Sequence, residues 1–92
     1  MNRNLIWLKM RKMVYLFNIL IQNGKISCDY IPEKSGSAGH IVIDTKTFEV
    51  EKIGYSDYKY GKNMYVAQVR SKLEELYKTQ ETMPKEAYAI WY

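Results

Sequence analysis

The stretch VYLFNILIQNGKISCDYI, residues 14–31, decides the fold. An Asn-Gly pair, Asn23 and Gly24, stands between two apolar runs. A type I′ turn needs positive φ at both central positions and Asn-Gly meets that need, so the pair predicts an antiparallel hairpin. The first run, VYLFNILIQ, is apolar on both faces, which favours a central strand covered on each side. Periodicity alone does not separate such a strand from a buried helix over the same residues.

Two further strands are expected after this hairpin. The run PEKSGSAG, residues 32–39, combines Pro, Gly, Ser and charge without periodicity and predicts an exposed loop. The chain resumes as HIVID and then FEVEKI, joined by the short polar connector Asp44 to Thr47. Two β-branched or aromatic runs so closely joined predict a second hairpin. The four strands together form an antiparallel meander.

From Asn63 onward the apolar residues recur at helical spacing. Asn63 is suited to be the N-cap, and the helix is expected to run to about Thr79. Ion pairs at i, i+4 are expected from Arg70 to Glu74 and from Glu74 to Lys78. The apolar face holds Val66, Val69, Leu73, Leu76 and Tyr77, and the polar face holds Gln68, Lys72, Glu75 and Lys78.

The chain closes with KEAYAIWY, residues 85–92, after Pro84 has ended any helix. Such bulky apolar groups are expected to dock on the sheet as a fifth strand. The predicted fold is therefore α+β: a four-stranded antiparallel meander packed by one amphipathic helix, with a C-terminal strand, in the order β-β-β-β-α-β. Residues 13–92 are expected to form one domain, and residues 1–12 an N-terminal arm that is either disordered or an extra helical turn.

Composition limits the classes of function. The chain has 47% hydrophobic and 26% charged residues, which is ordinary for a globular protein. Its apolar run from Met13 to Ile21 is too short to span a bilayer as a helix, so no membrane association is expected. One cysteine and one histidine make no internal disulfide and no zinc site, which favours a reducing cytoplasm and no cofactor.

No catalytic constellation is recognisable. Cys28 and His40 are the only candidates for a nucleophile and base, and they stand on opposite sides of the predicted loop. Cys28 in a strand is typical of a small core hydrophobe, and His40 of a solvated or backbone-bonded residue. Glu49 and Glu51 share a face by the two-residue period, as an acid pair or a solvated surface would. The sequence therefore predicts a protein that is not an enzyme.

The stretch GYSDYKYGK, residues 54–62, interleaves aromatic and basic side chains before the predicted helix. Tyrosine faces can stack on bases and lysines can neutralise phosphates, as in sequence-tolerant single-strand binding. The structural alternative is that Tyr55 ends the fourth strand, Tyr58 packs beneath the helix and the lysines remain solvated. The candidate interaction surface comprises Tyr55, Tyr58, Lys59, Tyr60, Lys62 and Arg70.

Two functions follow from these patterns. The first is a small protein-interaction module or accessory subunit that self-associates as a homodimer, because self-association would cover surplus apolar surface. This function depends on the first strand, which is apolar on both faces, and on the aromatic residues of the C-terminal stretch 85–92. The alternative is a nucleic-acid-binding protein with a preference for single strands, which depends on the net charge of +4, the KMRK cluster at residues 9–12 and the tyrosine-lysine stretch.

Overall fold

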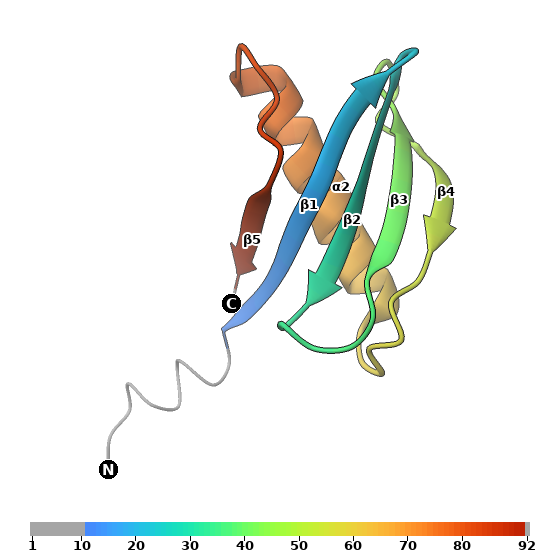
Figure 1. Ribbon diagram of the computed structural model, residues 1–92, viewed down its shortest axis with the longest axis vertical. Coiled ribbons are helices and arrows are strands. Elements are labelled where there is room, and N and C mark those ends of the chain that lie inside the picture. Colours follow the sequence, from blue (N-terminus) through green and yellow to red (C-terminus); the bar gives the residue numbers. More distant parts are fainter. Residues whose placement is uncertain (1–10, 92) are drawn as a thin grey trace.

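A single antiparallel sheet with one helix laid across one face makes up the computed structural model, which describes residues 11–91 (Figure 1). The strand order is β4-β3-β2-β1-β5. This arrangement confirms the predicted α+β fold of four meander strands, a helix and a C-terminal strand. The elements are β1 (Lys12–Gln22), β2 (Lys25–Pro32), β3 (Gly39–Asp44), β4 (Val50–Gly54), α2 (Lys62–Thr79) and β5 (Ala87–Trp91).

The β1–β2 hairpin forms as its turn residues require. Asn23 has φ 55° and Gly24 has φ 74°, so both central positions of the turn are left-handed. β1 lies between β2 and β5 and is therefore a central strand, not a helix. The expectation that both its faces are covered is wrong, because α2 covers one face and none of the described elements covers the other.

A bulge at Asn18 sets which side chains of β1 reach the core. Its φ is 53°, and the register with β2 shifts between Phe17 and Leu20. The extra residue turns Ile19 toward α2, where it is buried, and leaves Leu20 on the opposite face.

The core lies between the sheet and α2. Tyr30 is its largest fully buried side chain, and its ring lies against the backbone of Gly39 on the neighbouring strand. A Cβ at position 39 would lie 2.4 Å from Cζ of Tyr30, so only glycine fits there. The apolar core residues are Val14, Leu16, Ile19, Ile26, Cys28, Tyr30, Ile41, Ile43, Tyr65, Val66, Val69, Leu73, Leu76 and Ala89.

The helix α2 follows its predicted range but begins differently. Its N-cap is Gly61, with φ 67° and no side-chain capping bond, so the prediction of Asn63 as N-cap is wrong. Asn63 already lies within the first turn, where its Oδ1 accepts a hydrogen bond from the Tyr55 hydroxyl at 3.2 Å. The predicted ion pairs of Glu74 with Arg70 and Lys78 are confirmed, each at 2.8 Å.

At the two ends of the described chain, β5 pairs antiparallel with β1, and Val14 lies opposite Ala89. Lys12, assigned from sequence to the N-terminal arm, already belongs to β1, while residues 1–10 of that arm lie outside the described residues. Between residues 11 and 91, no helix has the length and apolar character needed to cross a membrane.

Candidate functional site

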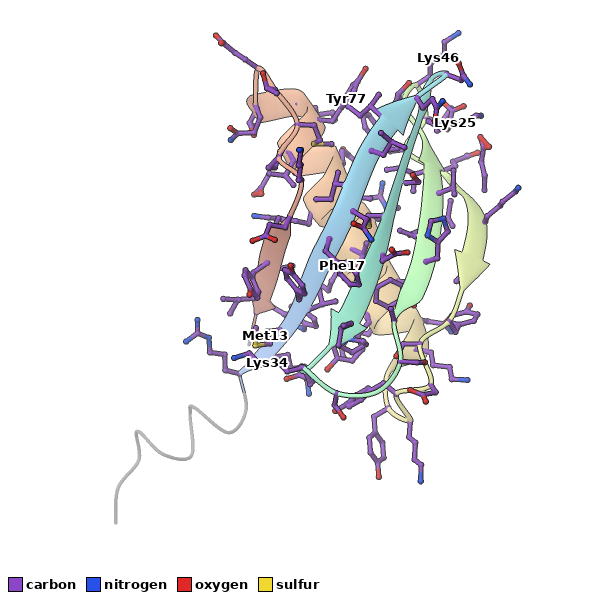
Figure 2. All side chains as sticks on the ribbon, in the orientation of Figure 1. Met13, Phe17, Lys25, Lys34, Lys46 and Tyr77 are labelled. Atoms are coloured by element: carbon purple, nitrogen blue, oxygen red, sulfur yellow. The ribbon has the colours of Figure 1, made fainter. Side chains whose placement is uncertain are left out.

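The sheet face turned away from α2 carries a cluster of apolar side chains over β1 and β5. Because residues alternate between faces, the positions that flank the buried Val14, Leu16 and Ala89 point outward. Figure 2 shows Met13 and Phe17 along β1. We call the following five residues the open-face patch: Tyr15, Phe17, Leu20, Tyr88 and Ile90.

Aromatic contacts order the centre of the open-face patch. The rings of Tyr15 and Phe17 stack with centroids 5.2 Å apart, and Tyr88 packs on Tyr15 at 4.9 Å. The Tyr15 hydroxyl donates to Oε2 of Glu86 at 2.8 Å, and this bond raises the pKa of the phenol. Exposed fractions of 53% for Leu20, 49% for Tyr88 and 46% for Ile90 leave much apolar area in water.

Two shallow hollows border the patch, and each has a lysine on its rim. The larger, of about 440 Å³, lies between Phe17, Leu20 and Lys85. The other, of about 270 Å³, lies between Tyr88, Ile31 and Lys34. Both hollows are too open to enclose a small molecule, and their apolar walls with a polar rim resemble the composition of protein contact surfaces.

Beside the patch, polar side chains from β1, β2 and β3 form a hydrogen-bonded cluster. Asp29 accepts hydrogen bonds from Nδ2 of Asn18 at 2.8 Å, and its other oxygen lies 2.8 Å from Nδ1 of His40. Partial burial raises the pKa of Asp29, but the bonds from Asn18 and His40 outweigh it, so the pKa lies below its usual value. His40 is therefore bonded to a carboxylate, not to backbone.

The two candidates for nucleophile and base lie on opposite faces of the sheet. Cys28 is 1% exposed within the core, and burial raises the pKa of its thiol to about 12. His40 lies on the open face with Asp29. The sheet therefore separates the two side chains, and Cys28 is the core hydrophobe that its strand position predicted.

Of the acidic pair considered from sequence, Glu51 lies in β4 and Glu49 lies just before it. Glu51 forms an ion pair with Lys25 of β2, whose ammonium also lies 3.2 Å from Asp44. The hydrogen bond to Glu51, and to a smaller extent the one to Asp44, raises the pKa of Lys25. Glu49 precedes β4, which begins at Val50. Glu51 therefore belongs to a surface ion-pair network on the open face.

Polar residues of the stretch 54–62 connect it to the loop between β2 and β3. Ser56 is buried, and its hydroxyl donates to the carbonyl of Ser37 at 2.6 Å. Oδ1 of Asp57 accepts from the backbone N–H of Ser37, also at 2.6 Å. We call these bonds the Ser37 tie. They fix the β2–β3 loop to the segment that leads into α2.

The structure brings part of the candidate interaction surface together at the start of α2. Lys62 Nζ lies 5.7 Å from the centre of the Tyr55 ring. Tyr58 is half-buried, packs edge-on against Tyr65 of α2 at 5.5 Å, and contacts Tyr60 at 6.0 Å. The side chains of Lys59 and Tyr60 are exposed, the latter at 73%.

Arg70 takes part in a different set of contacts. Its guanidinium donates to the Phe48 carbonyl at 3.1 Å and to Glu74 at 2.8 Å. These bonds hold α2 to the β3–β4 connection. No interaction among the described residues links Arg70 to the tyrosines and lysines at the start of the helix.

The open-face patch was not named from sequence, although its signal was present. From Met13 to Ile21 every residue of β1 except Asn18 is apolar, which indicates burial on both sides, and Tyr88 and Ile90 alternate with Ala87 and Ala89. The sequence predicted more apolar surface than one helix covers, but it did not show that β5 lies beside β1 and combines these side chains into one patch. Comparison of the chain with family models, with curated proteins and with solved structures finds no match in any of the three.

Proposed function

We propose that the protein is a small, non-enzymatic protein-interaction module or accessory subunit that self-associates. The observation that carries this proposal is the open-face patch. Three of its five side chains remain about half exposed, although the folded chain has a helix layer on the other face. The fold thus supports a contact surface that another protein chain would complete.

The chemistry of the patch favours a protein as its partner. Complete burial of one large apolar side chain contributes about 1.5–3 kcal/mol, so covering the exposed parts of Leu20, Tyr88 and Ile90 would contribute several kcal/mol. Tyrosine is enriched in the residues that dominate binding energy at protein interfaces. Tyr15 and Phe17 are already stacked, so ordering them on binding costs little side-chain entropy.

Charges around the patch are balanced, which suits association between identical copies. Lys25 is paired with Glu51 and Asp44, and Lys85 and Glu86 stand together beside Tyr15. A surface with both signs intermixed does not repel its own copy, whereas a uniformly basic one would. The one cysteine is buried, which is compatible with a reducing compartment, and we assign the protein to the cytoplasm as part of this proposal.

Sedimentation equilibrium from micromolar concentrations upward tests self-association. We expect the wild type to form a dimer as concentration rises. The double variant Tyr88→Ser/Ile90→Ser should weaken dimerisation by about tenfold or more, because it removes two half-exposed apolar side chains on one strand. Ile53→Ser, which changes an exposed isoleucine of β4, is the matched control and should dimerise as the wild type does. A wild type that stays monomeric throughout would contradict the proposal.

A second function, binding of single-stranded nucleic acid, has support at the start of α2. Lys62 lies over the Tyr55 ring, and Tyr60 and Lys59 are exposed beside it. A stacking face next to a cation is the arrangement that such binding uses.

Titration with a labelled single-stranded oligonucleotide at low and moderate salt tests this second function. We expect affinity to fall with salt, and Lys59→Gln/Lys62→Gln to bind more weakly with a smaller salt dependence, because two phosphate contacts are lost. Lys46→Gln/Lys52→Gln, two exposed lysines elsewhere, is the control of equal charge. Absence of binding at low salt would eliminate this function.

A further inference from the structure

We propose that the second copy in the self-association inferred above pairs with β5, edge to edge. The two β5 strands run antiparallel about a two-fold axis at Ala89 and join the two sheets into one. This inference rests on the proposed self-association and adds its geometry. It differs from a dimer in which two open-face patches stack on each other.

The two edges of the sheet differ in how well they are protected against such pairing. The edge strand β4 carries two adjacent charges, Glu51 and Lys52, and its register with β3 is irregular. Charges and bulges are the features that keep an edge from pairing with another chain. β5 has the sequence AYAIW, with no charge and no proline, and its register with β1 is regular over all five residues. Within residues 11–91, β1 is its only strand neighbour.

The sequence of β5 suits a two-fold axis at its middle residue. Antiparallel pairing about Ala89 places Tyr88 opposite Ile90 of the second copy, and Ile90 opposite its Tyr88. These two side chains lie on the open face and are about half exposed, so each covers the other. On the helix side, Ala89 of one copy faces Ala89 of the second copy, and these small side chains let the two strands approach. Ala87 of one copy faces Trp91 of the other.

The helix side of the same edge carries complementary charges. A hollow of about 190 Å³ lies beside β5, between Ala89, Ile90 and one side of α2. Lys72 and Glu75 line it and form an ion pair at 2.8 Å. A two-fold axis at Ala89 turns the second helix antiparallel to the first, which directs Lys72 of each copy toward Glu75 of the other. The charges at this edge therefore match those of its own copy.

Such pairing would also place the two open-face patches side by side. Tyr15 and Phe17 of each copy would continue the row formed by Tyr88 and Ile90 at the junction. The dimer would then present one apolar surface across two sheets to a further protein partner. Edge pairing thus buries part of each patch and joins the parts that stay exposed into one larger surface.

Disulfide trapping tests the pairing. Ala89→Cys brings two thiols into directly opposed positions, where antiparallel strands hold Cβ atoms within about 5.5 Å, so oxidation should trap a covalent dimer. The matched control is Ala87→Cys, on the same strand and the same face, whose two thiols would lie about 13 Å apart along the strands and beyond the reach of a bridge. The wild type is a second control, because its single cysteine is buried.

Efficient trapping of Ala89→Cys alone supports the edge dimer. If the wild type sediments as a dimer but Ala89→Cys forms no more covalent dimer than Ala87→Cys, the edge geometry is overturned while self-association stands. If the wild type is monomeric, both proposals fail. Hydrogen exchange of the wild type keeps the test independent of the cysteine variants: amides of β5 should gain protection as concentration rises, and unchanged protection in a dimer would overturn the inference.

Discussion

Gly39 shows how one residue without a side chain supports the core. The Tyr30 ring occupies the space that a Cβ at position 39 would need, and the carbonyl oxygen of Gly54 lies 2.7 Å from the same point. Tyr30 is the largest fully buried side chain, so its position depends on the absence of a neighbouring methyl group. The sequence places Gly39 at the end of a polar loop, and nothing in that context indicates a packing role.

We predict that Gly39→Ala lowers the free energy of unfolding by about 1–3 kcal/mol, the usual cost of overpacking a filled core. Urea denaturation monitored by circular dichroism measures it. Gly54→Ala is the control, because its Cβ would lie 3.8 Å from the nearest heavy atom, an ordinary contact. Its stability should remain within about 0.5 kcal/mol of the wild type. Equal stability of the two variants would contradict this account of Gly39.

Between elements, the Ser37 tie connects two loops that the sequence treats as separate. The loop after β2 and the stretch before α2 are 20 residues apart, yet Asp57 and Ser37 are hydrogen-bonded. Backbone and side-chain bonds from Ser37 lower the pKa of Asp57. A carboxylate whose pKa falls on folding stabilises the folded state above its unfolded pKa, and that stabilisation disappears as the pH falls through the folded pKa.

We therefore expect Asp57→Asn to be less stable than the wild type at pH 7, and the difference to narrow as the pH falls below the ordinary aspartate pKa of 3.8. Urea denaturation of both proteins at pH 7, 5 and 3 measures this difference. The comparison between variants cancels the titration of other carboxylates. A stability difference that does not change with pH would show that the Asp57 charge makes no contribution.

Element positions were largely predictable because the signals are local. The Asn-Gly turn predicts β1 and β2, and the change of apolar period from Asn63 onward predicts α2. The N-cap was not predictable by residue type, because a left-handed Gly61 precedes the helix and Asn63 binds Tyr55 instead. The positive φ of Asn18, which decides the face that Leu20 occupies, likewise has no sequence signal apart from asparagine itself.

For the whole molecule, the sequence predicted one sheet and one helix, but it did not show what would cover the second face of the sheet. Apolar residues on both faces of β1 indicated a sheet covered twice, and the described residues supply one helix. Covering a face depends on contacts between distant segments, and a second copy can provide them as well as the same chain can. The candidate surface around Tyr55 and Lys62 was found from local composition, whereas the open-face patch combines β1 with β5 and becomes visible only in three dimensions.

The pairing of β1 with β5 has a consequence for synthesis on the ribosome. Among the strands in residues 11–91, β1 is translated first, whereas one of its two neighbours, β5, is translated last. Until β5 emerges, β1 is an edge strand with apolar residues along both faces, and nascent chains on neighbouring ribosomes could pair with it. The bulge at Asn18 interrupts the regular hydrogen-bonding pattern midway along this temporary edge. The same residue that directs Leu20 outward in the finished protein would thus limit the length of regular edge that another nascent chain can pair with.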